Sequence, residues 1–222
     1  MRERTIRYKG DDITVYFSVD RCTHVAECIL GLPQVFDTAK RPWVNTQAAS
    51  ADEIAEVIIK CPTGALHFER KDGGPQETIP EKNTFRVEQD GPLYLWGNLE
   101  IRNADGSILI EDTRVAFCRC GHSMFKPLCD GRHDWAEFED DGTIKGSIPS
   151  KEPFASPHGK VIVKLTPNGP LIVKGAFELK NADGDIVFHG DKAAFCRCGA
   201  SATMPFCDSS HKRIDFKAED KK

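Results

Sequence analysis

Two sets of three cysteines and one histidine occur at identical spacing in this chain of 222 residues. The first set is Cys118, Cys120, Cys129 and His133, and the second lies 78 residues later as Cys196, Cys198, Cys207 and His211. Thiolate and imidazole ligands suit zinc or an iron–sulfur cluster and disfavour magnesium or calcium, which prefer oxygen. The repeated spacing therefore predicts two matched metal sites.

The remaining cysteines form a third group of three. The chain has nine cysteines, and those outside the repeats are Cys22, Cys28 and Cys61. An odd number leaves at least one cysteine unpaired in any disulfide scheme. The first ten residues are charged and have no apolar core, so they do not resemble a secretory signal. We therefore predict a reducing, cytoplasmic location.

Composition excludes several classes of function. The net charge is -4, the sequence pI is near 6.0, and no block of lysine or arginine predicts a nucleic-acid interface. An apolar run of about 18 residues, which a membrane-spanning helix would need, does not occur. The sequence also has no glycine-rich phosphate loop, nucleophile elbow or clear catalytic acid–base pair. We expect neither nucleic acid nor membrane as a partner, and no enzymatic activity.

The first predicted domain spans residues 1–70. Alternating apolar residues predict a half-buried strand over residues 13–17, and residues 23–30 predict a short helix. The segment 50–62 predicts a longer helix that begins with a capping-box pattern. A proline directly follows Cys61, so this cysteine should lie at the end of the helix.

The rest of the chain is a duplication of units of roughly 55 residues. A polar stretch rich in glycine and proline, residues 71–83, has the composition of a linker. The two copies span residues 84–139 and 160–217, and residues 140–159 form a spacer between them. Each copy predicts short strands around an Asp-Gly turn, then the ligand loop and a short helix.

An aspartate stands between the last two ligands of each copy. Asp130 lies in an N-cap-like position, and the two ligands beside it are four residues apart. A helix that begins there would place both ligands on one side. Asp208 repeats the pattern in the second copy.

The ligand loops, CRCGHSMFKPLCDGRH and CRCGASATMPFCDSSH, resemble the signature of the CDGSH iron–sulfur family. The resemblance implies a 2Fe-2S cluster in each copy, with Cys118 and Cys120 on one iron and Cys129 and His133 on the other, and the second copy likewise. Arg132 and Ser209 depart from the pattern, and neither is a ligand. Relatives with one motif form homodimers, so a tandem copy implies a monomer containing an intramolecular pseudo-dimer.

The alternative for the repeats is structural zinc. Zinc sites more often use cysteines two to four residues apart, and the Cys-x-Cys step is tight for that. The match to the full signature also weighs against zinc.

The N-terminal domain resembles single-cluster ferredoxins of the divergent bacterial type. The resemblance rests on Cys22-x5-Cys28, on Pro33-x-Val35-Phe36, on Trp43 and on Cys61-Pro62. The usual bacterial pattern places a middle ligand at position 25, which is Val25 here. Three cysteines favour a 3Fe-4S cluster, whereas a 4Fe-4S cluster would need His24 or a non-protein ligand. The remaining alternative is that the three cysteines are ordinary buried thiols that hold no cluster.

These observations predict an α+β protein, in which a small ferredoxin-like domain precedes two tandem β-rich CDGSH modules. The leading function is electron transfer through two 2Fe-2S clusters and one 3Fe-4S or 4Fe-4S cluster, with a redox partner protein. The second is storage of clusters or their delivery to an acceptor apo-protein. A zinc-stabilised interaction module is a third possibility.

Overall fold

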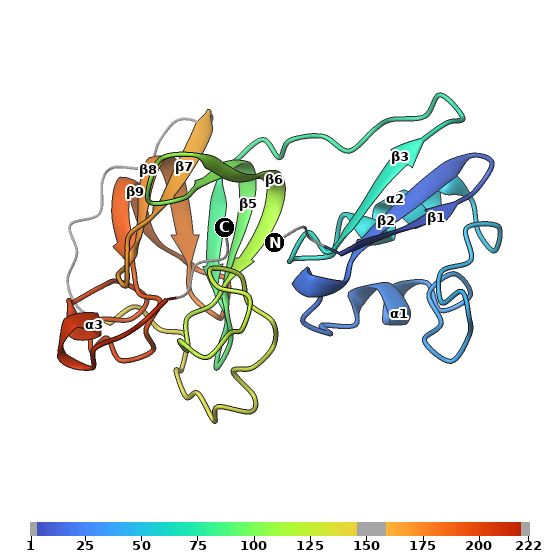
Figure 1. The fold of residues 1–222 in the computed structure, drawn as a ribbon. Coiled ribbons are helices and arrows are strands. Elements are labelled where there is room, and N and C mark those ends of the chain that lie inside the picture. Colours follow the sequence, from blue (N-terminus) through green and yellow to red (C-terminus); the bar gives the residue numbers. More distant parts are fainter. Residues whose placement is uncertain (1–3, 146–158, 219–222) are drawn as a thin grey trace. The chain divides into compact units, whose positions relative to one another are not determined.

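The protein is β-rich with few helices. The computed structural model describes residues 4–145 and 159–218, which fall into two compact units with a boundary between Thr78 and Ile79 (Figure 1). None of the helices in these described segments has the length and apolar character needed to cross a membrane. Residues 146–158 of the predicted spacer lie outside the described residues.

The N-terminal unit is a three-stranded antiparallel sheet with short helices. Its strands pair in the order β1-β2-β3. The elements are β1 (Thr5–Lys9), β2 (Ile13–Ser18), η1 (Val19–Arg21), α1 (Glu27–Gly31), α2 (Ala51–Ile58) and β3 (Leu66–Arg70).

Helix α2 confirms the predicted capping box. The Ser50 hydroxyl oxygen accepts a hydrogen bond from the Glu53 N–H at 3.3 Å, and the Ser50 N–H donates to the Glu53 carboxylate at 2.9 Å. These two bonds satisfy backbone and side-chain groups at the start of the helix. Ile54 and Ile58 on its inner face are fully buried in the core of the unit. Cys61 follows the helix, and its N–H donates to the Ile58 carbonyl oxygen.

The helix predicted over residues 23–30 was wrong in its bounds. Helix α1 begins only at Glu27 and includes Gly31. His24 and Ala26 have φ angles of 59° and 68°, in the left-handed region. A right-handed helix cannot continue through such residues, so the segment before α1 is an irregular loop.

The C-terminal unit contains one six-stranded sheet built from both repeats (Figure 1). Repeat 1 supplies β4 (Thr84–Val87), β5 (Leu93–Arg102) and β6 (Ile108–Phe117), and repeat 2 supplies β7 (Lys160–Leu165), β8 (Leu171–Lys180), β9 (Ile186–Phe195) and α3 (Ser210–Arg213).

Each repeat's first strand pairs with the second strand of both repeats. Strand β4 runs antiparallel to its own β5 and parallel to β8, where Thr84 lies opposite Glu178. Strand β7 runs antiparallel to its own β8 and parallel to β5, where Ile162 lies opposite Glu100. Given the offset of 78 residues, the two parallel pairings have the same register. The strand pairing is therefore reciprocal.

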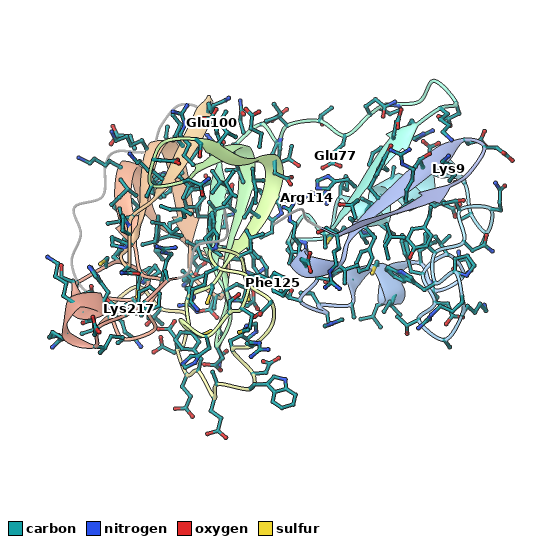
Figure 2. The ribbon with its side chains drawn as sticks, in the orientation of Figure 1. Lys9, Glu77, Glu100, Arg114, Phe125 and Lys217 are labelled. Carbon is teal, nitrogen blue, oxygen red and sulfur yellow. The ribbon has the colours of Figure 1, made fainter. Side chains whose placement is uncertain are left out.

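The strands of both repeats contribute to one shared hydrophobic core. Phe85 of repeat 1 stacks on Phe177 of repeat 2, with ring centroids 4.4 Å apart, and both side chains are fully buried. Polar contacts also cross between the repeats: the Lys160 ammonium lies 2.7 Å from the carboxylate of Glu100, which is labelled in Figure 2. Asn83, the linker residue directly before β4, also contacts repeat 2, since its side-chain amide donates to the Ala176 carbonyl oxygen at 2.9 Å. Neither repeat therefore buries its apolar face alone.

The short helix predicted after each ligand loop forms in repeat 2 but not among the described residues of repeat 1. Repeat 1 has only turns over residues 131–137, and repeat 2 has the four-residue α3, which begins at Ser210. Each aspartate closes a local turn, because its carboxylate accepts the N–H of the residue two positions later. Because repeat 2 forms α3 with the same bond, this bond alone does not decide whether a helix follows.

Candidate metal centres

The ligand loop of each repeat folds back on the strand that precedes it. Cys118 directly follows β6, and its N–H donates to the Pro127 carbonyl oxygen at 3.0 Å. The N–H of Cys129 donates to the Ala116 carbonyl oxygen at 2.9 Å. The equivalent two bonds of repeat 2 measure 2.9 and 2.8 Å. The sheet thus sets the positions of the first and third cysteines in both loops.

The predicted ligands of each repeat come together as two pairs. In repeat 1, the Cys118 and Cys120 sulfurs are 3.6 Å apart, and the Cys129 sulfur is 3.4 Å from His133 Nδ1. In repeat 2, the matching distances are 3.5 and 3.4 Å, in the pairs Cys196–Cys198 and Cys207–His211. Two donors that share one tetrahedral metal at 2.0–2.3 Å lie about 3.5–3.8 Å apart. Each pair therefore has the spacing of two ligands on one metal.

The four donors of a repeat do not converge on one point. Within residues 4–145 and 159–218, no three histidine, cysteine, aspartate or glutamate side chains form a group that could hold a single metal ion. A structural zinc site needs four donors around one ion.

Hydrogen bonds from Asp130 and Ser123 hold the first loop in shape. The Asp130 carboxylate accepts the N–H of Met124 at 2.8 Å. The Ser123 hydroxyl donates to the Leu128 carbonyl oxygen at 2.6 Å and accepts from the Phe125 N–H. Repeat 2 forms the same bonds through Asp208 and Ser201. The signature contained these residues, but the sequence alone did not indicate that they brace the loop.

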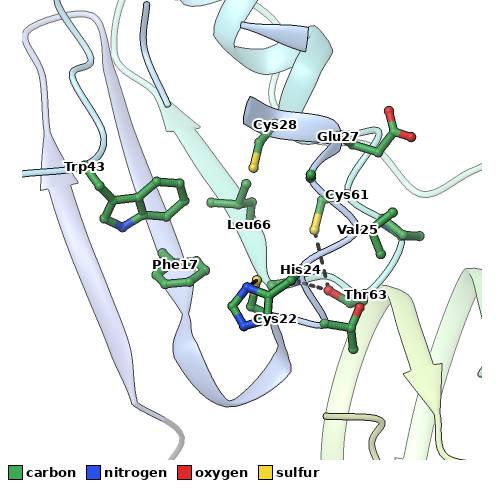
Figure 3. Close-up of a pocket in the computed structure, with 14 residues that line it drawn as sticks. Phe17, Cys22, His24, Val25, Glu27, Cys28, Trp43, Cys61, Thr63 and Leu66 are labelled. Atoms are coloured by element: carbon green, nitrogen blue, oxygen red, sulfur yellow. Dashed lines mark hydrogen bonds between the residues drawn. The ribbon is translucent and has the colours of Figure 1, made fainter. Parts of the chain in front are cut away.

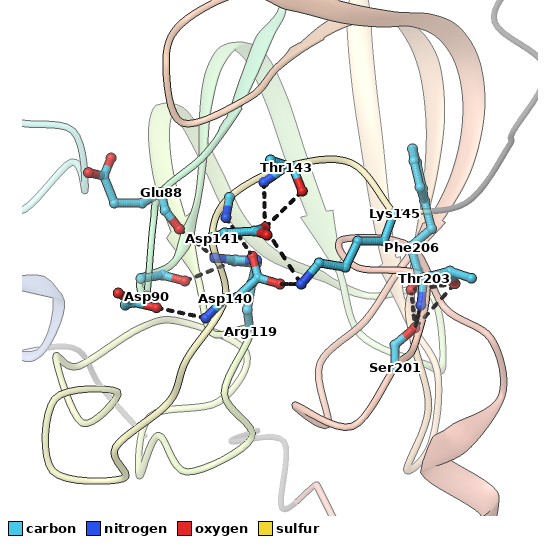
Figure 4. Close-up of polar contacts among 12 residues, drawn as sticks. Glu88, Asp90, Arg119, Asp140, Asp141, Thr143, Lys145, Ser201, Thr203 and Phe206 are labelled. Atoms are coloured by element: carbon cyan, nitrogen blue, oxygen red, sulfur yellow. Dashed lines mark hydrogen bonds and ion pairs between the residues drawn. The ribbon is translucent and has the colours of Figure 1, made fainter.

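A buried arginine between the first two ligands is a further bracing residue that sequence reasoning missed. Arg119 is 1% exposed, and its guanidinium donates to carbonyl oxygens of Glu88 and Gly91 and to the Asp140 carboxylate (Figure 4). Arg197 makes the same two carbonyl contacts in repeat 2. The Cys-Arg-Cys triplet in both copies was the available signal. These contacts tie each ligand loop to the turn before the second strand of its own repeat.

The two ligand loops approach each other closely at two glycines. A Cβ atom at Gly121 would lie 2.7 Å from the Cys198 carbonyl oxygen, and one at Gly199 would lie 2.5 Å from the Cys120 carbonyl oxygen. Both glycines also have positive φ angles, 82° and 79°. Only glycine fits such positions without a backbone shift. The contact is reciprocal, as is the strand pairing.

The thiols of repeat 1 are buried and influence one another. A hydrogen bond with the Cys120 thiol lowers the pKa of Cys118 to about 6, and the same bond raises the pKa of Cys120. Burial raises the pKa of Cys129 to about 12. Without a bound metal, therefore, the loop does not favour three thiolates at neutral pH, although the nearby Lys126 ammonium helps to lower the pKa of Cys118. A bound metal supplies further positive charge and releases the protons.

Three cysteines of the N-terminal unit line one pocket (Figure 3). Cys22 lies just after η1, Cys28 lies in α1, and Cys61 follows α2. Burial raises the pKa of Cys28 to about 11, and the neighbouring Cys61 and Cys22 add to the rise. Burial also raises the pKa of Cys22, with a contribution from Cys61. The three sulfurs are thus close enough to interact, as ligands of one cluster must be.

Besides the cysteines, four residues with polar side chains line this pocket: Thr23, His24, Glu27 and Thr63. Val25, which occupies the expected position of a middle ligand, lines the pocket with an apolar side chain. His24 Nδ1 lies 3.9 Å from the Cys22 sulfur. The Cys61 sulfur lies 3.5 Å from the Thr63 hydroxyl oxygen. Aromatic and aliphatic side chains, among them Phe17, Trp43 and Leu66, complete the wall.

Comparisons with known proteins match the same three regions. Residues 8–71 match the family described as "Divergent 4Fe-4S mono-cluster", and residues 90–134 and 168–212 each match "Iron-binding zinc finger CDGSH type". The chain is 33% identical over 64 residues to the "Uncharacterized protein YjdI" of Escherichia coli K12 and to that of Escherichia coli O157:H7. The match covers 29% of this chain and 84% of each relative. No solved structure matches the chain. Both resemblances noted in the sequence are confirmed.

Proposed function

This chain belongs to the divergent 4Fe-4S mono-cluster family through its N-terminal unit and to the CDGSH iron-binding family through both repeats, and on that premise we propose that it is an electron-transfer protein. Three clusters would carry the electrons: two 2Fe-2S clusters in the repeats and one 3Fe-4S or 4Fe-4S cluster in the N-terminal unit. The partner would be a redox protein.

The paired arrangement of donors carries this proposal. In a 2Fe-2S cluster, each iron takes two protein ligands, so four ligands divide into two close pairs. The distances of 3.4–3.6 Å within the pairs support such a division. In repeat 1, Cys118 and Cys120 would hold one iron, and Cys129 and His133 the other. The equivalent residues would hold the cluster of repeat 2.

One histidine in each donor set favours electron transfer at a raised potential. Neutral imidazole replaces a thiolate and removes one negative charge, which raises the reduction potential relative to a site with four cysteines. Nδ1 of each ring faces the cysteine sulfur of its pair. The bound cluster would supply one-electron redox chemistry. The chain's own part is to position the donors, exclude water and set the local charge.

The N-terminal pocket supports one cluster with three cysteine ligands. In a cuboidal cluster, each cysteine binds a different iron, so ligands of neighbouring irons stand well apart. His24 Nδ1 lies only 3.9 Å from the Cys22 sulfur, which suits a contact with that sulfur better than binding of a fourth iron. This geometry favours 3Fe-4S. The description of the matching family favours 4Fe-4S, with a non-protein ligand on the fourth iron.

The two repeats would form an intramolecular pseudo-dimer in a monomeric protein. The reciprocal strand pairing and the reciprocal glycine contacts support this, because a two-fold interface requires each contact to occur twice. Sedimentation should then give a species near the chain mass of 24.7 kDa. A stable species of twice that mass would contradict the proposal.

Cluster storage or delivery to an apo-protein is the second candidate. It is favoured by the environment of Cys207, which is half-buried, whereas its counterpart Cys129 is only 3% exposed. A more accessible ligand edge eases the attack of an acceptor thiol. We further propose that the protein acts in the cytoplasm, is not an enzyme, and binds neither nucleic acid nor a membrane.

A redox titration of the purified protein, followed by electron paramagnetic resonance, tests the leading proposal. Three reversible one-electron centres that pass electrons to an oxidant without losing iron would support electron transfer. Transfer of iron to an added apo-ferredoxin, at a rate as fast as the loss of clusters from this protein, would favour delivery. An oxidised 3Fe-4S cluster has an odd number of electrons and is paramagnetic, whereas an oxidised 4Fe-4S cluster is not, so the same titration separates them.

A further inference from the structure

The cysteine pocket of the N-terminal unit contains a buried hydroxyl, that of Thr23, which forms no hydrogen bond with any part of the chain that the structure describes. Thr23 lines the pocket between two of its other residues, Cys22 and His24. Its Oγ1 atom is shielded from solvent and has no hydrogen-bond partner among the described residues. Burying a hydroxyl without a partner is costly, so native structures rarely leave one in this state.

The second threonine of the pocket shows what such a hydroxyl can do. Thr63 Oγ1 accepts the N–H of Ala65 at 3.2 Å and lies 3.5 Å from the Cys61 sulfur. The Thr63 hydroxyl accepts this backbone bond through a lone pair, so its own hydrogen is free to point at that sulfur. Hydroxyl-to-sulfur contact is therefore already a feature of this pocket.

The backbone holds Thr23 in place. Arg21, two residues before Thr23, is 4% exposed, and its guanidinium donates to the Thr63 carbonyl oxygen at 3.2 Å. The following His24 has a φ of 59°, so the chain turns sharply after Thr23. Thr23 therefore lies between an anchored residue and a tight turn and has little freedom to find another partner.

We propose that the Thr23 hydroxyl donates a hydrogen bond to a sulfur of the N-terminal cluster and thereby raises its reduction potential. The inference rests on the cluster proposed above for Cys22, Cys28 and Cys61. Reduction adds negative charge to the cluster sulfurs, so a donor aimed at them stabilises the reduced form more than the oxidised one. Thr23 acts through the cluster sulfurs and is not a ligand.

The test compares Thr23→Val, which keeps the shape and removes the hydroxyl, with Thr23→Ser, which keeps the hydroxyl. Thr38→Val is the matched control, because Thr38 is exposed and lies outside the pocket. For each full-length protein, iron per chain is measured first. The N-terminal cluster is then followed by electron paramagnetic resonance at the midpoint potential of the wild type, where its reduced and oxidised forms are equal.

We expect the ratio of reduced to oxidised cluster to fall roughly three- to tenfold in Thr23→Val, the change that one neutral hydrogen bond typically produces. In Thr23→Ser and Thr38→Val, the ratio should stay within about twofold of the wild type. An unchanged ratio in an iron-replete Thr23→Val protein would overturn the inference. If that variant does not fold, Thr23→Ala also removes the hydroxyl, and the same ratio of reduced to oxidised cluster is measured in it. Absence of an N-terminal cluster from the wild type would instead overturn the proposed function itself.

Discussion

The two ligand loops share their donor geometry but differ in the charges around it. Distances within the donor pairs agree to 0.1 Å between the repeats, and the same aspartate, serine and arginine contacts brace both loops. The residues between these bracing positions have diverged. The duplicated fold therefore fixes where the donors stand and leaves the surrounding electrostatics free to vary.

Lys126 and Asp134 are two of the charged positions near the ligands that differ between the repeats. Lys126 of repeat 1 is replaced by Met204 in repeat 2. The Lys126 ammonium donates to the Ser123 carbonyl oxygen at 2.7 Å, and its charge assists the Cys120 thiol and backbone donors in lowering the pKa of Cys118. Asp134, whose carboxylate lies 3.6 Å from His133 Nε2, is replaced by a lysine in repeat 2. The two clusters should therefore differ in potential while sharing one ligand set.

The close contact between the loops is the feature whose loss should have the largest effect. Gly121→Ala adds a methyl group 2.7 Å from the Cys198 carbonyl oxygen, at a φ of 82°. We expect a loss of unfolding free energy of about 3 kcal/mol or more, from backbone strain and the clash together. The measurement is denaturant unfolding of the loaded protein.

Gly106→Ala is the control for this experiment. Gly106 has a φ of 93°, and nothing lies within 4 Å of its added Cβ, so only the backbone strain remains. That strain should cost about 1 kcal/mol. Equal losses in the two variants would mean that the loops do not touch where we place the contact.

Replacing the histidine ligand should have the next largest effect. His133→Cys adds a thiolate charge and should lower the potential of the first cluster by on the order of 100 mV or more. The second cluster should keep its potential and serve as an internal control, while His211→Cys should reverse the pattern. Redox titration by visible absorbance and electron paramagnetic resonance checks both. If neither variant changes the reduction potential of its cluster, the histidines are not ligands.

Exchanging Lys126 and Met204 between the repeats tests whether this charge sets the difference between the two cluster potentials. Lys126→Met removes a positive charge near Cys118 and should lower the first cluster's potential by about 40 mV, the equivalent of about 1 kcal/mol. Met204→Lys should raise that of the second cluster by a similar amount. The shifts should shrink at high ionic strength. Shifts of the same sign in both variants would contradict a charge effect.

The smallest effect should come from the turn that follows the third cysteine. Gly131 has a φ of 82°, and Ser209 takes a φ of 73° at the equivalent position. Ser209→Gly should therefore stabilise the protein by about 1 kcal/mol, and Gly131→Ser should destabilise it by a similar amount. Thermal unfolding of both variants provides the measurement. A loss of stability in Ser209→Gly would show that the serine side chain has a role beyond the turn.

Local signals in the sequence predicted the elements that local interactions determine. The capping box at Ser50 gave the start of α2, and the alternation of apolar residues predicted β2 to within one residue of its end. The ligand residues were recognisable because metal chemistry requires particular residue types at particular spacings. The structure brings all eight predicted donors of the repeats into pairs.

Features that depend on distant parts of the chain could not be predicted. The left-handed conformation of Ala26 is held by its surroundings, since alanine alone disfavours it. Repeat 1 has turns where repeat 2 has α3, although Asp130 and Asp208 accept the same backbone bond. The pairing of β4 with β8 joins residues more than 90 positions apart, and no local pattern specifies that register. The buried role of Arg119 likewise became visible only with its partners in place.

Metal and sulfide analysis of the purified protein, with cluster typing by electron paramagnetic resonance, tests the central claim most directly. We predict seven or eight irons per chain. Four belong to two 2Fe-2S clusters, each held by three cysteines and one histidine, and three or four belong to the cluster of the N-terminal unit. A protein with four irons would contradict the N-terminal cluster alone. A colourless protein with stoichiometric zinc and little iron would contradict the account of both repeats.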